Sequence, residues 1–211
     1  MIKRLLKSLL ILSLLCGCTT KISKSFNVNV SVDLSDDSSM VEEEKKEPTR
    51  AEKLGITVYR QDDIKWGQDV MSPSTDTLKR SGCLVASIAS AVTMNGHKMT
   101  PADMNALFVK KGVYDSMGNT QWDRLRAIKY YNVIVYEGTS TQNLDNCLKK
   151  KRYPIICTHS LKSGNPHYVL VVNKDGDDYD IMDPKFDDLK RLSDYKNDIK
   201  LIRCVYYSKK S

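Results

Sequence analysis

Two residues of this chain, Cys83 and His167, have the types and surroundings of a hydrolytic centre. Cys83 opens a run of small and apolar residues, 83–92, which is typical of a largely buried helix. At the first turn of a helix, free backbone N–H groups and the helix dipole favour a thiolate over a thiol. His167 opens an apolar, strand-like run after the polar segment 162–166, so its ring is expected at an edge or cleft. A thiolate beside an imidazole predicts nucleophilic attack on a carbonyl group.

Asp183 is the third candidate, because a hairpin is expected between it and His167. Residues 174–176 read Lys-Asp-Gly, and a three-residue loop with Gly last is a favoured hairpin with a bulge. That loop places Asp183 directly opposite His167 on one face, with Cβ atoms about 5 Å apart. A carboxylate there would fix the imidazole tautomer and support its charged form. A two-residue loop would instead pair His167 with Pro184 and turn Asp183 to the other face.

Helical patterns precede most of the strand patterns. A Thr N-cap, a Pro in the first turn and an Asp three residues after the cap predict a helix from Thr100 to Lys111. Gly96 and Gly112 are placed to end the helices before them. Further helices are expected over 121–130 and 142–151, and strands over 133–136, 154–157, 167–172, 179–182 and 201–207. This order predicts an α+β fold with a mostly antiparallel sheet.

The composition indicates one globular domain with appendages. The chain has 211 residues, of which 41% are hydrophobic and 28% charged, which excludes collagen-like, low-complexity and polytopic membrane chains. Six cysteines are too few for a disulfide scaffold. The net charge is +7, and Lys3, Arg4 and Lys7 supply three of those charges. The remaining excess is too mild to indicate a nucleic-acid partner.

The amino terminus reads as an export signal. Basic residues precede a short apolar run at 9–15, which is too short to span a membrane and fits a signal peptide. Leu15-Cys16-Gly17-Cys18 resembles a bacterial lipobox, which implies cleavage after residue 17 and a lipid on Cys18. An ordinary signal peptide cut elsewhere is the alternative. We therefore expect a signal peptide at 1–17, a lipidated and disordered tether at 18–52, and a folded domain at 53–211, anchored to the outer face of a bacterial membrane.

Six motifs occur in the order found in papain-like cysteine peptidases. The motifs are residues 59–66, 81–83, 121–122, 153–156, 167–171 and 183–184. Together they span most of the domain. The chain resembles most closely the bacteriocin-processing, double-glycine-leader type, the C-thirty-nine-like family in peptidase naming. The resemblance implies a papain-like fold, with the catalytic Cys at a helix start packed on an antiparallel sheet that carries the His and the Asp.

The resemblance also implies roles for individual residues. Cys83 would be the nucleophile, His167 the general base and then acid, and Asp183 the orienting residue. A Gln upstream would join the backbone N–H of Cys83 in an oxyanion hole; Gln61 fits the family pattern best and Gln68 is the second choice. Leu84 stands where many relatives have Gly, which bears on how substrate reaches the thiol. No cofactor or metal is required.

Three interpretations of the domain remain open. The first is a membrane-anchored thiol hydrolase acting on a peptide or protein, the second a catalytically inactive binding or adhesion lipoprotein, and the third a cell-wall amide hydrolase or acyl transferase. A zinc site formed by Cys147, Cys157, His159 and Cys204 is disfavoured by their spacing. The basic run 149–152 has no groove motif beside it and predicts a helix end rather than a nucleic-acid site. His97 follows a helix end and is expected to be exposed.

Overall fold

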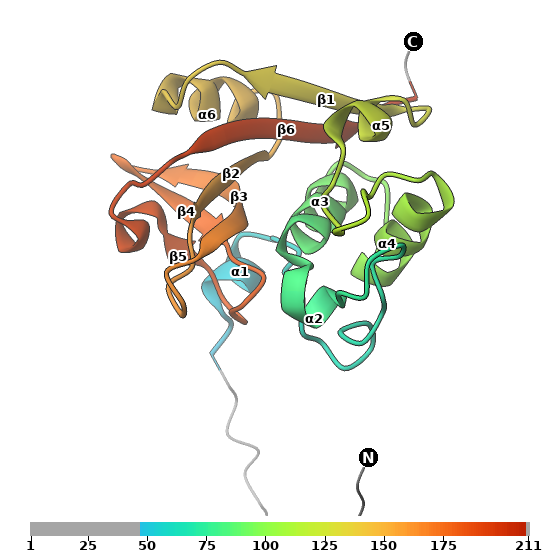
Figure 1. Ribbon diagram of the computed structural model, residues 1–211. Coiled ribbons are helices and arrows are strands. Elements are labelled where there is room, and N and C mark those ends of the chain that lie inside the picture. Colours follow the sequence, from blue (N-terminus) through green and yellow to red (C-terminus); the bar gives the residue numbers. More distant parts are fainter. Residues whose placement is uncertain (1–46, 210–211) are drawn as a thin grey trace, which may run out of the picture. The chain divides into compact units, whose positions relative to one another are not determined.

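A six-stranded antiparallel sheet runs through residues 47–209, the part of the chain that the computed structural model describes (Figure 1). Its order is β1-β6-β2-β3-β4-β5. The strands are β1 (Tyr131–Tyr136), β2 (Pro154–His159), β3 (Pro166–Asp175), β4 (Asp178–Met182), β5 (Lys190–Arg191) and β6 (Leu201–Tyr207). The five longer strands are those that the sequence predicts, and the short β5 is an addition. The predicted α+β class is confirmed.

Helices cover both faces of the sheet. They are α1 (Arg50–Lys53), α2 (Leu78–Ser81), α3 (Cys83–Met94), α4 (Pro101–Lys110), α5 (Trp122–Arg126), α6 (Thr141–Leu148) and the 3₁₀ turn η1 (Leu192–Tyr195). Because side chains alternate along a strand, β3 contributes to two cores. Leu170 and Val172 join the core of α3 and α4, while Val169 and Val171 join the core of α6 and η1.

The helix over 100–111 begins as predicted, whereas two others are shorter than expected. The Thr100 hydroxyl accepts from the Asp103 N–H and the Asp103 carboxylate accepts in return, which is the capping box that the sequence indicates. The helix expected over 121–130 ends at Arg126, because the chain must turn before β1, and Tyr130 takes a positive φ of 72° there. The helix expected over 142–151 ends at Leu148, before Lys151 with a φ of 51°.

The folded part begins before residue 53, where the sequence analysis places its start. Thr49 caps α1 through a capping box, and Arg50 reaches the far edge of the sheet. The Arg50 guanidinium donates to both oxygens of Asp180, at 2.7 and 2.9 Å, and Arg191 of β5 binds the same carboxylate at 2.8 Å. The Asp180 side chain is fully buried, so these two cations compensate a charge that water cannot reach.

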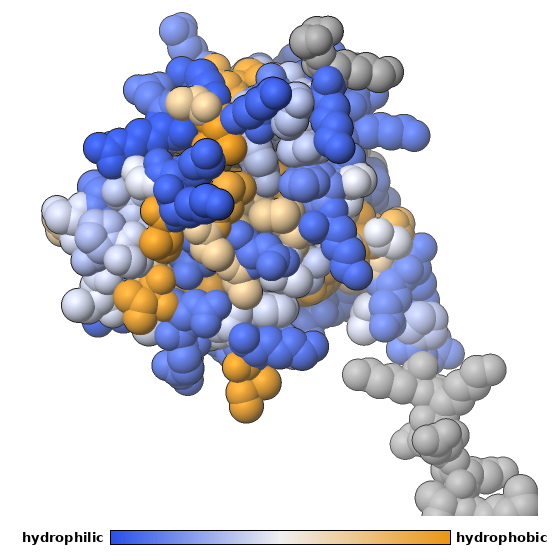
Figure 2. Space-filling model, turned by 90° about the vertical axis from the view of Figure 1, so that its right-hand side faces the viewer, coloured by the Kyte–Doolittle hydropathy of each residue, from blue (hydrophilic) through white to orange (hydrophobic). Residues whose placement is uncertain are grey.

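The surface of the described residues is largely polar. On the face shown in Figure 2, apolar side chains lie in small groups among hydrophilic ones, as on a solvated surface. Ile64 and Met117 are the most exposed of the large hydrophobic side chains. None of the helices within residues 47–209 is long and apolar enough to cross a bilayer.

Replacing Asp180 with Ala should destabilise the fold. The substitution removes a buried acceptor from Arg50 and Arg191, which are partly exposed and keep other carboxylate partners, so we expect a cost of about 1–3 kcal/mol. Asp187→Ala is the control, because Asp187 is 82% exposed where it binds Arg60 and should cost less than about 1 kcal/mol. Urea unfolding of both variants measures the difference, and equal midpoints would contradict the interpretation of the buried cluster.

Candidate active site

Cys83 is the first residue of α3 and directly follows Gly82, the residue that joins α2 to α3. Gly82 ends α2 and caps α3, and a Cβ on it would lie 2.5 Å from the Leu78 carbonyl oxygen. Only glycine therefore lets the chain turn so tightly at this position. As the first residue of a twelve-residue helix, Cys83 has a backbone N–H with no acceptor one turn earlier in that helix. The positive end of the helix dipole lies at the same place.

His167 and Asp183 form a short hydrogen bond in the interior. His167 Nε2 lies 2.7 Å from Asp183 Oδ1, and the two side chains are 2% and 0% exposed. This bond leaves Nδ1 as the ring nitrogen available to Cys83. The sequence predicts that Cys83, His167 and Asp183 form one centre, and the structure brings the three side chains together.

The predicted hairpin register is wrong, although the predicted face is right. Asp175 pairs with Asp178, so the loop has two residues, and this register alone would turn Asp183 away from His167. A bulge between Val171 and Asn173 shifts the pairing by one residue and corrects the face. Continued past the last pair, the shifted register puts Asp183 one side-chain position from His167, diagonally across the strands.

Asp183 accepts two further hydrogen bonds. The Lys185 N–H donates to Oδ1 at 2.8 Å, and the Tyr195 hydroxyl of η1 donates to Oδ2 at 2.7 Å. Both carboxylate oxygens are therefore occupied. Sequence reasoning missed Tyr195, because nothing in the residues around it marks the long-range contact that it makes.

For both His167 and Asp183, hydrogen bonds and nearby charges together affect the pKa more than burial does. Burial alone would lower the pKa of His167, but hydrogen bonds with Asp183 and Cys83, and the charges of both groups, raise it to about 9. Burial alone would raise the pKa of Asp183, yet hydrogen bonds from His167, Tyr195 and the Lys185 backbone hold it below its ordinary value. An imidazolium and a carboxylate are thus the stable forms at neutral pH.

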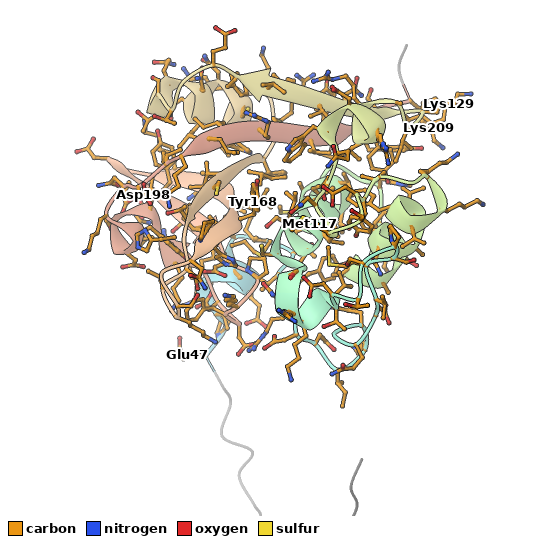
Figure 3. All side chains as sticks on the ribbon, viewed as in Figure 1. Glu47, Met117, Lys129, Tyr168, Asp198 and Lys209 are labelled. Atoms are coloured by element: carbon orange, nitrogen blue, oxygen red, sulfur yellow. The ribbon has the colours of Figure 1, made fainter. Side chains whose placement is uncertain are left out.

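Cys83 and His167 line a common cavity of about 330 Å³. Met117 and Tyr168 also line it, and Figure 3 shows them near the middle of the molecule, where the helical side meets the sheet. Gln61 is another wall residue, whereas Gln68, the second choice for the oxyanion hole, is exposed and is not in the lining. Leu84 also contributes to the wall.

Hydrogen bonds hold both the side chain and the backbone of Gln61. Its side chain is 2% exposed, and Nε2 donates to the Lys79 carbonyl oxygen at 2.9 Å. Its backbone N–H donates to the Pro184 carbonyl oxygen at 2.9 Å, next to Asp183. The Oε1 atom is buried and has no partner among the described residues.

The remaining candidates lie apart from this cavity. Cys147, Cys157 and Cys204 are buried free thiols, and residues 47–209 contain no group of three or more His, Cys, Asp and Glu that could hold a metal. His97 is less exposed than expected, because its ring stacks on Tyr207 with centroids 3.7 Å apart. Cys18 and the expected signal peptide lie outside the described residues.

The pKa values of two histidines are expected to shift in opposite directions from the ordinary value. His167 should stay protonated at pH 7 and titrate near 9, whereas burial and the charge of Lys209 lower the pKa of His97 below 6.5. Because folding raises the pKa of His167, its contribution to stability, on the order of 3 kcal/mol, is complete below pH 6.5 and is lost as the pH rises through 9. Asp183→Asn should lower the pKa of His167 sharply, since burial then dominates. Titration of the ring ¹⁵N shifts by NMR measures each value, and two histidines titrating together near 6.5 would contradict it.

Comparison with family models and with the sequences of curated proteins identifies no relative of this chain. No family model matches the chain, and no curated protein matches its sequence. The chemistry of the site therefore rests on the positions of Cys83, His167, Asp183 and Gln61.

Proposed function

We propose that this chain is a thiol hydrolase that cleaves a peptide or other amide bond with a Cys-His-Asp centre. The observation that carries the proposal is the buried 2.7 Å contact between His167 and Asp183, at a cavity that Cys83 also lines. The three groups come from a helix start, a strand and the loop after the next strand, an arrangement that supports a papain-like fold as part of the proposal.

The proposed reaction proceeds through a covalent intermediate. The Cys83 thiolate, paired with the His167 imidazolium, attacks the carbonyl carbon of the amide. His167 then donates its proton to the leaving amine, which departs and leaves a thioester on Cys83. A water molecule, deprotonated by His167, hydrolyses the thioester and restores the thiolate–imidazolium pair. Asp183 stays ionised throughout and keeps the ring oriented.

An oxyanion hole is available beside the thiol. The Cys83 backbone N–H, at the start of α3, is one donor, and the Gln61 amide on the same cavity is the other. Gln61 Nε2 donates to the Lys79 carbonyl oxygen at 2.9 Å and, over a longer distance of 3.4 Å, to the Leu78 carbonyl oxygen. In the proposed mechanism, the hydrogen of the longer contact turns to the negative oxygen of the tetrahedral intermediate and stabilises it.

The proposed location is the outer face of a bacterial membrane. The lipobox-like sequence ending at Cys18 supports a signal peptide at 1–17 and a lipid on Cys18, and the tether that follows would hold the domain away from the membrane. A cell-wall peptide is then an accessible substrate beside proteins and free peptides. The alternative functions are an inactive adhesion module and an acyl transferase. The two tests below distinguish the hydrolase from both.

Alkylation by iodoacetamide tests whether Cys83 is activated. At pH 6 an ordinary thiol is almost wholly protonated, whereas a thiolate paired with His167 reacts. We expect His167→Ala to slow the alkylation of Cys83 about tenfold or more, after allowance for the lower nucleophilicity of a stabilised thiolate. His97→Ala is the matched control and should change nothing. Equal rates at Cys83 in all three proteins, measured by mass spectrometry, would refute the hydrolase proposal.

Hydrolysis assays test the reaction itself. We expect the full chain to cleave members of a peptide library or peptidoglycan fragments, and Cys83→Ala to abolish cleavage. Gln61→Ala should lower kcat about 10²–10³-fold by removing one oxyanion donor, whereas Gln68→Ala should leave it unchanged. Transfer of the acyl group to an added amine in place of water would identify an acyl transferase. An activated Cys83 with no turnover on either substrate set would favour the binding module.

A further inference from the structure

Tyr195 makes the third polar contact to the Asp183 side chain. Its hydroxyl donates to Asp183 Oδ2 at 2.7 Å, on the oxygen that His167 does not use. Tyr195 is fully buried, and it is the last residue of η1, twelve positions after Asp183. Cys83, His167, Asp183 and Tyr195 therefore form a chain of polar groups that runs from the cavity into the core.

We propose that Tyr195 is a positioning residue of this centre, which holds the Asp183 carboxylate ionised and oriented toward His167. The inference rests on the proposed function and extends it to a residue outside the cavity lining.

Two physical requirements make the phenol more than a core side chain. A buried carboxylate needs a donor on each oxygen to remain ionised, and no donor other than Tyr195 is recorded for Oδ2 within residues 47–209. A carboxylate held at one oxygen only can also rotate about its terminal bond, which would misalign the oxygen that binds His167. Burial raises the pKa of Tyr195, so the hydroxyl keeps its proton and remains a donor.

The titratable groups around Tyr195 and Asp183 come from several elements. His167 on β3 and Cys83 on α3 lie on the cavity side, and the Asp183 carboxylate lies between them and the phenol. The His159 ring of β2 packs edge-on against Tyr195 with centroids 6.0 Å apart, and Asp194 precedes Tyr195 in η1. Loss of the phenol proton donor would act on Asp183 first, because the Tyr195 hydroxyl donates its hydrogen bond to the Asp183 carboxylate.

Tyr179 provides a matched control for the loss of a buried hydroxyl. It belongs to the same core cluster as Tyr195, is 4% exposed, and donates to Asp145 at the same distance of 2.7 Å. Asp145 is not in the cavity lining. Tyr195→Phe and Tyr179→Phe therefore each remove a 2.7 Å hydrogen bond from a buried phenol to an aspartate, and only the first touches the proposed centre.

The experiment is the rate of Cys83 alkylation by iodoacetamide in the full chain, followed from pH 4 to 8. We expect Tyr195→Phe to slow alkylation at pH 6 about tenfold and to move the acidic limb of the profile toward neutral pH, because Asp183 then takes up a proton more readily. Tyr179→Phe should leave the rate within twofold and the limb unmoved. Equal effects of the two substitutions would reduce Tyr195 to a structural role and overturn the proposal.

A double-mutant cycle identifies the partner. In an Asp183→Asn background, Tyr195 has no charge to hold, so adding Tyr195→Phe should change the alkylation rate less than twofold. Multiplicative effects of the two substitutions would overturn the proposal. Should Tyr195→Phe fail to fold, 3-fluorotyrosine at position 195 keeps the ring and makes a stronger donor, and the acidic limb should then move to lower pH; an unmoved limb would count against the proposal.

A separate measurement distinguishes this proposal from the hydrolase proposal. NMR titration of the His167 ring reports the Asp183 contact whether or not Cys83 reacts. If Cys83 is no more reactive than an ordinary thiol, the hydrolase proposal fails, while a His167 titration that Tyr195→Phe alters and Tyr179→Phe does not would still support the positioning of Asp183 by Tyr195.

Discussion

The buried hydrogen bond between His167 and Asp183 is the interaction on which the site depends. Each group would lose its charge if it were buried alone, because burial favours the neutral form of both. Together they hold an imidazolium and a carboxylate whose side chains are only 2% and 0% exposed. The pair is therefore stable only while the geometry is kept, since separating the partners would leave two uncompensated charges in the interior.

One short loop keeps that geometry and ties the two halves of the domain together. Asp183 begins the loop, the Lys185 N–H binds the Asp183 carboxylate, and the Pro184 carbonyl accepts from the Gln61 N–H. The Lys185 ammonium reaches back to Ser160 after β2. Displacement of this loop would therefore disturb the proposed base and the proposed oxyanion donor at once, which couples their positions.

Local features of this fold could be predicted from the sequence, and long-range ones could not. The capping box of α4, the strand runs and the helix start at Cys83 follow from neighbouring residues. The hairpin register could not be obtained in this way, because it depends on a bulge between Val171 and Asn173 that the turn residues do not indicate. The buried contacts of Asp180 with Arg50 and of Asp183 with Tyr195 join residues whose local sequence gives no sign of a partner.

Comparison of the cysteines shows why ionisation of a thiol is not enough to make a nucleophile. Hydrogen bonds from Cys204 and Tyr136, together with nearby basic side chains, lower the pKa of Cys147 to about 7 against the effect of burial. Yet Cys147 is 1% exposed, and it does not line the cavity that Cys83 and His167 share. Cys83 differs in being partly exposed, in lining a cavity and in having an imidazole beside it to move the proton. Access and a neighbouring proton carrier are what support Cys83 as the proposed nucleophile.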